Sequence, residues 1–553
     1  MDQPNAVTID KCGDGLEYDY VIVGAGSSGC AVAAELARDG RYTVALLEAG
    51  GRNRHPFIEM PRGYAALWTD PKYFWKFPVK PQPGRPSGEV WYYGKGLGGS
   101  SAVNGAWYFR GQPADYDSWE AAGNAGWNWR TFEAAYQRVE SFTEPHADSS
   151  RGQHGPISVS TVKWRSALTE AAIAAGRESG LDVLDDVNTP RRSGVGYTQM
   201  SVDRTGRRVS SWRGFLGKCR ATELATFSGA LVERISFEGK RATGVIGQYH
   251  GKPVAWRARK CLVLSAGVLQ SPKLLQLSGI GDPDLLARHG IEVVHPLPHV
   301  GRNMSEHMML ELGFRLKGAP GMNREFRGWR LYRNVTQYYL TRKGPMAYGL
   351  PEVSAMLSST GDTSWPNIQL GFSPATFEPP AEGTNEPGRG KTERAPGLSV
   401  VAFFLRPKAR GSVAIQSASI LDPVLIDANW LAEPDDATVA IDMVKIVRRY
   451  VSQPALAKYV VGELAPTAAA QSDEEIGALL PSILRSGLHG TGTCRMGDDP
   501  ATSVVDRWGR AHDVPNLFIV DGSLMVTSAA VNPTSTIQAL ALRTADYIKQ
   551  ARG

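Results

Sequence analysis

One glycine-rich loop has residue types and a spacing that point directly to chemistry. Residues 20–24 (YVIVG) form an apolar strand pattern, and a loop reading GAGSSG leads from them into a helix pattern of small residues over 28–38. Gly24 allows a sharp turn, Gly26 lets the backbone approach a pyrophosphate, and Gly29 lets the helix pack closely on the strand. The free N–H groups at the helix N-terminus bind phosphate. The loop predicts a dinucleotide site, with an ordinary glycine turn as the alternative.

A carboxylate follows the next strand pattern. Residues 43–47 (TVALL) end at Glu48, which lies 19 residues past Gly29. A carboxylate at the end of the second strand can accept hydrogen bonds from the ribose of adenosine. Because strand, loop, helix, second strand and acid occur in order, residues 18–50 predict a complete dinucleotide-binding unit.

A second cluster of glycines follows at residues 93–107 (YGKGLGGSSAVNGAW). Within 94–106, five glycines and two serines make the segment costly in backbone entropy when it folds. Such a segment suits a place where the backbone must lie flat against a planar or anionic group. Taken alone, it also fits a tight loop or an anion-binding nest of N–H groups.

The elements that must position these loops are spread along the chain. Residues 260–265 (KCLVLS) and 517–520 (LFIV) are apolar strand patterns that each end near a small or acidic residue. Open parallel sheets bind ligands at the carboxyl ends of their strands, so one nucleotide-binding unit is expected to use the start, middle and end of the chain. Residues 272–278 predict a short helix with Pro272 in its first turn, and 534–549 predict a C-terminal helix.

The intervening region is predicted to contain a second, antiparallel group of strands. Strand patterns occupy residues 311–315, 366–373, 399–406 and 411–416. Residues 378–397 are rich in proline, glycine and charge, which predicts an insertion loop. That loop is expected to be a solvated surface segment or a lid over a substrate entrance.

Composition is typical of a soluble globular enzyme and excludes several other classes. The 553 residues are 42% hydrophobic and 21% charged, and the net charge of +6 is small and scattered, which argues against a nucleic-acid partner. The five cysteines are dispersed without a CxxC pair, so neither a disulfide framework nor a metal site is expected. Residues 1–17 form a polar tail without the features of a signal peptide, and no apolar run is long enough to span a membrane. A cytoplasmic location is expected.

Three motifs give the chain a family resemblance over about residues 18–548. The first is GKGLGGSSAVN at 94–104, and the second is GVLQSPKLLQLSGIG at 267–281. The third is PHVGRNMSEH at 298–307, where the family usually has PGVGxNLxDH. Taken together, the chain resembles the glucose-methanol-choline (GMC) oxidoreductases, which oxidise alcohols with FAD. His299 and Glu306 depart from the third motif.

The resemblance implies an α/β (overall α+β) fold with a Rossmann-like FAD-binding domain and a discontinuous substrate-binding domain on an antiparallel sheet. The FAD-binding domain is expected at 18–159, 225–309 and 491–553, and the substrate-binding domain at 160–224 and 310–490. The oligomeric state is left open.

The resemblance also implies a catalytic pair near the C-terminus. His489, in LHGTGTCRMG at 488–497, matches the family histidine that faces the reactive edge of the flavin. Asn532, 43 residues later, matches a position that is histidine in some members and asparagine in others. An imidazole can take the hydroxyl proton of an alcohol, and an amide N–H can hold the developing alkoxide. Cys494 is expected to be a buried packing residue, and His307 a hydrogen-bonded loop residue.

FAD is the implied cofactor, and the resemblance together with the two glycine motifs gives its binding residues. They are Gly24, Gly26, Ser27, Ser28, Gly29, Glu48, Ala49, Trp75, Gly94, Gly98, Gly99, Ser100, Asn104, Gly105, Ala106, Val232, Ala266, Leu488, Asp521, Gly522, Asn532, Pro533 and Thr534. Trp75 and Val232 match contacts on the adenine side in relatives. Some relatives attach FAD through a histidine at the position of Val103, so non-covalent FAD is expected here.

Departures from the family narrow the substrate. Choline-oxidising relatives often carry tyrosine where this chain has Leu488 and glutamate where it has Met309. A quaternary ammonium favours an aromatic cage and a carboxylate, so choline is disfavoured. The expected substrate is another primary alcohol (aryl, furanic or aliphatic) and the acceptor is oxygen or a quinone-type molecule. The alternatives are a polyol or sugar dehydrogenase of the same family, a lyase with structural FAD, and, less favoured, a nicotinamide enzyme.

Overall fold

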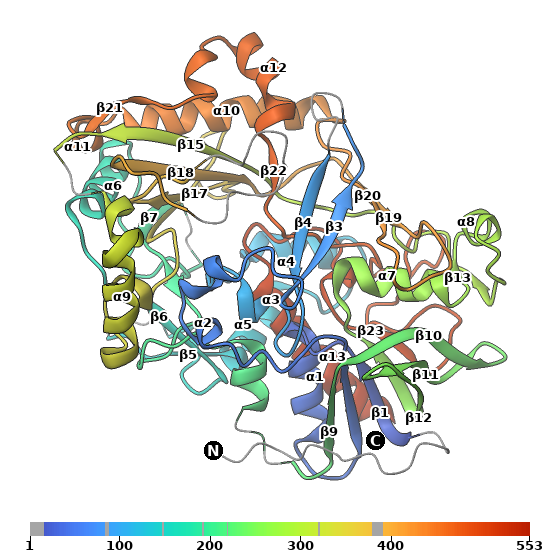
Figure 1. Cartoon of the computed structure of the whole chain (residues 1–553). Helices are drawn as coiled ribbons and strands as arrows, with labels where there is room; N and C mark the ends of the chain where they lie inside the picture. Colours follow the sequence, from blue (N-terminus) through green and yellow to red (C-terminus); the bar gives the residue numbers. More distant parts are fainter. Residues whose placement is uncertain are drawn as a thin grey trace.

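Two sheets of seven strands dominate the fold (Figure 1). The computed structural model describes residues 16–82, 88–145, 149–190, 193–217, 219, 221–318, 321–378 and 391–552. In Figure 1 the first sheet lies at the lower right with β1 and β12, and the second lies at the upper left with β15 and β18. The ribbon of β3 and β4 stands between them. This mixed architecture confirms the predicted fold class.

The first large sheet carries the glycine loop. Its order is β10-β11-β12-β1-β2-β9, with β23 paired to β12. The strands are β1 (Leu16–Val23), β2 (Val44–Glu48), β9 (Leu224–Ser228), β10 (Ala230–Glu238), β11 (Arg241–Tyr249), β12 (Lys252–Leu264) and β23 (Leu517–Ile519). β9, β2, β1, β12 and β23 are parallel, whereas β10 and β11 are antiparallel. Helices α1 (Ser27–Ala37) and α13 (Thr534–Arg552) pack against each other beside the sheet.

The parallel strands are apolar almost throughout because the sheet is covered on both faces. All five residues of β2 and the last four of β1 are buried. Their carboxyl ends meet at one edge, and this edge contains the first glycine loop and the segments that follow β12 and β23. The predicted contribution of distant chain segments to one sheet is therefore present.

The second large sheet has the order β21-β15-β18-β17-β16-β7, with β22 paired to β15, and each pairing is antiparallel. Its strands are β7 (Gly194–Tyr197), β15 (Met308–Leu316), β16 (Val353–Leu357), β17 (Ile368–Ser373), β18 (Gly397–Phe404), β21 (Val460–Glu463) and β22 (Arg485–Ser486). Helices α6 (Ala167–Glu178), α10 (Pro434–Val451) and α12 (Asp473–Ile483) share its apolar core. Figure 1 shows α10 and α12 above this sheet.

Three smaller sheets and several short helices complete the described part of the chain. The further strands are β3 (Phe74–Val79), β4 (Glu89–Gly94), β5 (Glu140–Phe142), β6 (Ile157–Thr161), β8 (Gln199–Met200), β13 (Ile280–Gly281), β14 (His295–Pro296), β19 (Ser412–Ala414) and β20 (Leu425–Asp427). The further helices are α2 (Pro56–Glu59), α3 (Ser100–Val103), α4 (Pro113–Ala121), α5 (Trp129–Val139), α7 (Gly267–Leu277), α8 (Pro283–Arg288), α9 (Gly328–Thr341) and α11 (Pro454–Ala457). Single turns are η1 (Gly63–Ala66), η2 (Trp212–Leu216), η3 (Met322–Phe326), η4 (Pro345–Ala347), η5 (Thr467–Ala469) and η6 (Gly522–Leu524).

Two predictions from local sequence differ from the structure. The strand predicted at 411–416 is β19, which pairs with β20 in the small sheet of β3 and β4 instead of joining β15, β17 and β18. The helix predicted at 272–278 is α7, which begins at Gly267 and contains Pro272 in its interior. Proline removes the N–H that would bond to the carbonyl of Val268. That carbonyl accepts a hydrogen bond from the Thr493 hydroxyl at 2.6 Å instead, which explains why the helix tolerates the proline.

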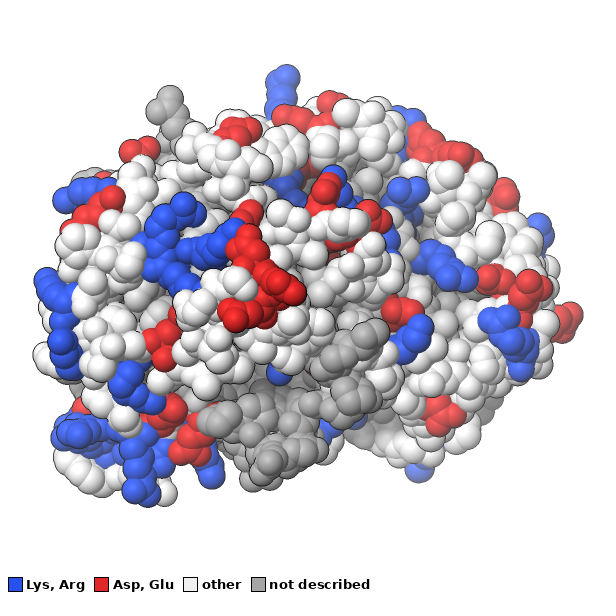
Figure 2. Space-filling model, turned by 90° about the horizontal axis from the view of Figure 1, so that it is seen from above, with Lys and Arg blue, Asp and Glu red and all other residues white. Residues whose placement is uncertain are grey.

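The predicted tail and insertion loop lie partly outside the described residues. Leu16 and Glu17, which were assigned to the tail, form the start of β1, where they pair with β12. Of the loop predicted at 378–397, residues 379–390 lie outside the described residues. Figure 2 shows basic and acidic side chains interspersed over one face of the molecule. Across the described ranges, no helix combines the length and apolarity needed to cross a bilayer, and the cytoplasmic location stays a prediction.

Candidate active site

The turn between β1 and α1 has the geometry expected of a phosphate-binding loop. Gly24 has a φ of +102°, and a Cβ atom there would lie 2.4 Å from the carbonyl oxygen of Ser265. A Cβ atom on Gly29 would lie 1.9 Å from the carbonyl oxygen of Gly24, so the close packing of helix and strand requires glycine. A Cβ atom on Gly26 would meet no protein atom within 4 Å. The open space beside Gly26 is where a ligand can approach the backbone.

Glu48 joins the two glycine motifs. One carboxylate oxygen accepts the backbone N–H of Ala25 at 3.0 Å. The other accepts the backbone N–H groups of Gly50 at 2.8 Å and Gly96 at 2.9 Å. The side chain also lines the pocket at the end of β2. Its structural role is therefore to hold both loops together, in addition to the ribose contact predicted for it.

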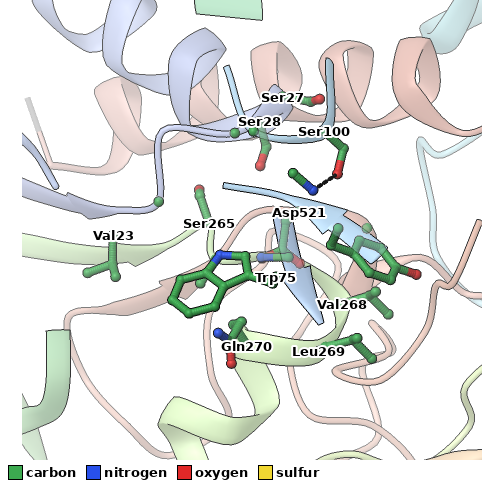
Figure 3. Close-up of a pocket in the computed structure, with 18 of the residues that line it drawn as sticks. Val23, Ser27, Ser28, Trp75, Ser100, Ser265, Val268, Leu269, Gln270 and Asp521 are labelled. Atoms are coloured by element: carbon green, nitrogen blue, oxygen red, sulfur yellow. Dashed lines mark hydrogen bonds between the residues drawn. The ribbon is translucent and has the colours of Figure 1, made fainter. Parts of the chain in front are cut away.

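The second glycine motif lies directly against the first. A Cβ atom on Gly99 would lie 2.8 Å from the Cα atom of Gly26. The Ser100 hydroxyl accepts the backbone N–H of Gly94 at 3.0 Å, which closes the turn between β4 and α3 (Figure 3). Larger side chains at the contact would separate the loops, and this gives a physical reason for the high glycine content.

A pocket opens between these loops. The predicted cofactor residues that line it are Gly24, Gly26, Ser27, Ser28, Glu48, Ala49, Trp75, Gly94, Gly99, Ser100, Val232, Ala266, Leu488, Asp521, Gly522, Pro533 and Thr534. The lining does not include Gly29, Gly98, Asn104, Gly105, Ala106 or Asn532. The pocket is thus assembled from segments near residues 25, 95, 230, 266, 489, 521 and 533.

Sequence reasoning missed part of the lining. Ser265, Gly267, Val268, Leu269 and Gln270 line the pocket where β12 passes into α7. The second family motif begins at Gly267, directly after a strand pattern. Its place at the end of a strand indicates residues that contact the ligand. Figure 3 shows the ring of Trp75 reaching across the pocket near Gln270.

Two of the predicted residues have clear roles in holding the pocket walls. The carboxylate of Asp521 accepts the backbone N–H of Gly267 at 2.8 Å and the Ser271 hydroxyl at 2.6 Å. It thereby ties the segment after β23 to the start of α7. The Lys95 ammonium lies over the Trp75 ring, 4.1 Å from its centroid, and forms a cation–π contact with it.

The segment Asn104 to Ala106 lies beyond the lining and is itself braced. The Asn104 side-chain oxygen accepts the backbone N–H of Ala106 at 3.0 Å and a guanidinium N–H of Arg208 at 2.9 Å. Arg208 is buried, and this burial lowers its pKa to about 10. The structure therefore gives Asn104 a bracing function and leaves its predicted cofactor contact as a prediction.

The structure brings the predicted catalytic pair together. The Nδ2 atom of Asn532 lies 2.9 Å from Nε2 of His489. Neighbours of both residues, Leu488 and Pro533 among them, line the pocket. Leu488 has a φ of +59°, a strained conformation for a branched side chain, and such strain occurs at sites where geometry is imposed by the surroundings.

His307 touches the predicted base from the other side. Its Nδ1 atom lies 3.1 Å from Nδ1 of His489, and the two rings are nearly perpendicular. The amide Nδ2 of Asn532 can only donate, so Nε2 of His489 accepts and carries no proton. The proton of His489 then sits on Nδ1 and is donated to His307. His307 is thus a hydrogen-bonded loop residue, as predicted, and its partner is His489, the predicted base.

Burial sets the protonation of this cluster. Burial, and secondly the nearby His307, hold the pKa of His489 well below its usual value. Burial also lowers the pKa of His307 to about 3, while main-chain groups of Ala529 and Leu405 oppose the shift. Both imidazoles are therefore neutral at physiological pH, and a neutral imidazole is the form that can accept a proton.

Glu306 holds the loop that contains His489. Its carboxyl group accepts the backbone N–H of His489 at 2.8 Å, and burial raises its pKa to about 8. Glu306 stands where the family usually has aspartate, and the longer side chain reaches the main chain of the catalytic loop. Cys494 is fully buried, and burial raises the pKa of its thiol, so it is a poor nucleophile.

Aromatic side chains lie beside and behind His489, the predicted base. The Phe403 ring centroid is 5.5 Å from that of His489, and the Trp107 ring centroid is 6.0 Å from that of Phe403. The Trp107 indole N–H is satisfied by the carbonyl of Leu350 at 3.0 Å. His489 therefore has an aromatic neighbour in Phe403, on which Trp107 packs in turn.

Comparisons with known proteins agree with this architecture. A family model described as GMC oxidoreductase matches residues 18–309, and a second model of the same description matches residues 407–541. The chain belongs to the GMC oxidoreductase family and is an FAD-dependent oxidoreductase. The resemblance deduced from the sequence motifs is therefore confirmed.

Two curated relatives match almost the whole chain. An alcohol dehydrogenase [acceptor] of Pseudomonas putida is 34% identical over 541 residues, which cover 96% of this chain and 95% of the relative. An oxygen-dependent choline dehydrogenase of Pectobacterium atrosepticum is 32% identical over 541 residues, covering 97% of this chain and 95% of the relative.

Solved structures show the same fold. Pyridoxine 4-oxidase from Mesorbium loti is 28% identical with a TM-score of 0.84, covering 96% of this chain and 99% of that one. Formate oxidase from Aspergillus oryzae, described with FAD modification, is 24% identical with a TM-score of 0.88, covering 98% of this chain and 99% of that one. The second likeness concerns the fold alone.

Proposed function

We propose that this enzyme oxidises a primary alcohol to the aldehyde, with His489 as the base and Asn532 as the amide donor. The observation that carries the proposal is the 2.9 Å contact between His489 Nε2 and Asn532 Nδ2 beside the pocket. An unprotonated ring nitrogen beside an amide N–H supplies the acceptor and the donor that an alcohol hydroxyl needs.

The pocket suits FAD on several grounds. The open space at Gly26, next to the N-terminus of α1, fits a pyrophosphate. The pocket continues past Trp75 and Gln270 to the loop that holds His489, and the side-chain oxygen of Gln270 is buried without a protein partner. A long cofactor with an adenosine at one end, a pyrophosphate in its middle and a polar ring system at the other end would fit such a pocket. The two glycine motifs and the segments after β12 and β23 would hold FAD.

The protein's part in the reaction follows from the proton positions. The alcohol hydroxyl takes the place of the direct contact, donating to His489 Nε2 and accepting from Asn532 Nδ2. As the proton moves to His489, the Nδ1–H bond to His307 stabilises the imidazolium that forms. The Asn532 amide stabilises negative charge on the substrate oxygen. FAD, when bound, would supply the acceptor for the hydride of the substrate carbon, and oxygen or a quinone-type molecule would be the final electron acceptor.

The residues around the base support an apolar substrate. Phe403 lies beside His489 and Trp107 packs on Phe403, and Leu488 and Met309 supply neither the ring nor the charge that choline would require. Aryl, furanic and aliphatic primary alcohols fit this surrounding better than a polyol or sugar, whose hydroxyls would face apolar groups without hydrogen bonds.

We infer that FAD is held without a covalent bond. The position used for histidine attachment in some relatives is Val103, a buried residue of α3 with no nucleophilic atom. Acid precipitation is therefore expected to release all the yellow colour into the supernatant. Colour that stays with the precipitated protein would contradict the inference.

The experiment that tests the function is anaerobic titration of the holoenzyme with a panel of primary alcohols. Bleaching of the flavin band would demonstrate alcohol oxidation, and readmitted air would then show whether oxygen is the acceptor. His489→Ala is expected to slow flavin reduction by about 10²-fold or more while FAD stays bound. Flavin that no alcohol reduces would favour the lyase alternative over the proposed reaction.

A further inference from the structure

Helix α9 exposes large apolar side chains on one face. Trp329 is 67% exposed, Tyr332 is 75% exposed and Leu340 is 80% exposed. With exposed Thr336 between them, these residues follow the three-and-four spacing that places side chains on one side of a helix. Single exposed apolar residues are common, but three on one short helix form a patch that calls for an explanation. We call these three residues the α9 patch.

The opposite face of α9 is fixed to the protein, so the patch cannot turn inward. Tyr338 is buried, and its hydroxyl donates to the carbonyl oxygens of Glu59 and Gly206 at 3.1 and 3.0 Å. Asn334 is also buried, and its amide donates to the carbonyl of Glu325 at 2.9 Å. Figure 1 shows α9 at the outer left edge of the molecule. The patch therefore faces outward in the folded enzyme.

Basic side chains surround the patch. Residues 321–344 contain six basic side chains, namely Arg324, Arg327, Arg330, Arg333, Arg342 and Lys343, and a single carboxylate. That carboxylate, Glu325, is shared by Arg330 at 3.2 Å and Arg333 at 2.6 Å. The Arg333 guanidinium also lies 5.2 Å from the Trp329 ring centroid. Arg327 is likewise paired with Glu378 at 2.6 Å, so three of the six cations have a carboxylate partner, and residues 321–344 keep an excess of basic over acidic side chains.

The combination matches the chemistry of an anionic lipid surface. Tryptophan and tyrosine favour the headgroup level of a bilayer, where the ring is buried and its polar end stays hydrated. Arginine and lysine near such residues are attracted to acidic lipids. A protein partner fits less well, because three side chains on one convex helix expose roughly 400 Å², whereas a stable interface buries about 800 Å² per partner.

We propose that α9 docks this enzyme on the surface of an anionic membrane, with the α9 patch in the headgroup layer and the surrounding cations against acidic headgroups. This attachment is peripheral and involves no membrane-spanning segment. It is independent of the reaction assigned to the pocket, since none of these residues lines it.

Flotation of the purified holoenzyme with lipid vesicles tests the proposal. Binding is expected to vesicles that contain acidic lipid, to weaken with pure phosphatidylcholine, and to weaken as salt screens the charges. The double variant Trp329→Ser with Leu340→Ser is expected to lower the partition coefficient at least about tenfold. FAD content should stay unchanged, because both side chains are exposed.

A matched control changes exposed apolar residues elsewhere. Leu421 is 77% exposed and Val461 is 62% exposed, and Leu421→Ser with Val461→Ser should leave vesicle binding unaltered. No binding to acidic vesicles, or equal binding by the α9 variant, would overturn the proposal. It would also be overturned by light scattering that showed a dimer which only the α9 variant dissociates, because the patch would then be a contact between copies of the chain.

Discussion

At the scale of single residues, the position of one proton decides whether His489 can act. If Nε2 carries a lone pair, the proton of the neutral ring must be on Nδ1. In a buried site this Nδ1–H group needs a hydrogen-bond acceptor. Nδ1 of His307 lies 3.1 Å away and is the atom that can accept this proton. His307 is thus a positioning residue, because it acts on the substrate only through His489.

Removal of this hydrogen-bond acceptor should slow flavin reduction without loss of bound FAD. His307→Phe keeps a ring of similar size but has no nitrogen, and we expect flavin reduction to slow by about 10 to 100-fold. His307→Gln offers a side-chain oxygen and should recover part of the rate. Stopped-flow reduction by the best alcohol measures both variants, and the bound FAD spectrum is the control. Equal rates for His307→Phe and the unaltered enzyme would show that His307 does not position the base.

The lowered pKa of His489 predicts an unusual pH dependence. A pKa well below 6.5 keeps the imidazole neutral where an ordinary histidine would be protonated. The rate of flavin reduction should therefore stay constant as the pH falls from about 7 to about 5.5. Stopped-flow measurements over this range, with the FAD spectrum checked at each pH, test the expectation. A rate that falls with an apparent pKa near 6.5 would show that the pKa of His489 is not lowered.

At the scale of elements, the carboxyl end of β2 controls the cofactor loops. Glu48 accepts three backbone N–H groups from the two glycine motifs. Hydrogen bonds to a buried charge are worth about 1.5–3 kcal/mol each, so the carboxylate is expected to hold both loops in their binding conformation.

Replacement of this carboxylate should weaken FAD binding. In Glu48→Gln one acceptor oxygen becomes an amide that faces N–H donors, and we expect the Kd for FAD to rise about 10 to 100-fold. Glu238→Gln, which changes an exposed glutamate at the end of β10, is the matched control. Fluorescence titration of the apoenzyme with FAD gives both constants. An unchanged Kd for Glu48→Gln would assign the carboxylate a dispensable role.

Sequence patterns predicted the helices and strands that depend only on neighbouring residues. The strand, loop and helix around Gly26 follow from apolar runs and glycine spacing, and Glu48 follows from its place at a strand end. The course of α7 could not be predicted, because Pro272 is tolerated through the hydroxyl of Thr493, a residue 221 positions further along the chain. The sheet that β19 joins is likewise decided by its pairing with β20, and through β20 with β3.

The same distinction applies to the candidate site. His489 and Asn532 were assigned through the family motifs, and the structure places them in contact. The approach of His307 to His489 joins residues 182 positions apart, and nothing in either segment encodes it. The bracing of Asn104 by Arg208 is also a long-range contact. The residue types and motifs predicted the acid–base chemistry of the site, whereas tertiary packing determined which side chains form hydrogen bonds with the site residues.

At the scale of the whole molecule, segments from distant parts of the chain together form the pocket. Its walls come from the first large sheet, from the small sheet of β3 and β4, from α7 and from the loops before α13. These segments span almost the whole chain, so a ligand that fills the pocket contacts parts that are distant in sequence. Binding of FAD should therefore stabilise the native state as a unit and not one loop alone.

This linkage predicts a measurable change in thermal stability. A ligand that binds only the native state stabilises it by about 4 kcal/mol at a free concentration of 1000 times its Kd. For a chain of 553 residues that corresponds to a rise in Tm of about 3 °C. Differential scanning calorimetry of apoenzyme with and without FAD measures the shift. NAD should give a smaller shift, because it shares the ADP half of FAD but lacks the ring system that the far end of the pocket would hold. An equal shift with NAD would favour the nicotinamide alternative, and no shift with FAD would show that the native protein does not bind FAD.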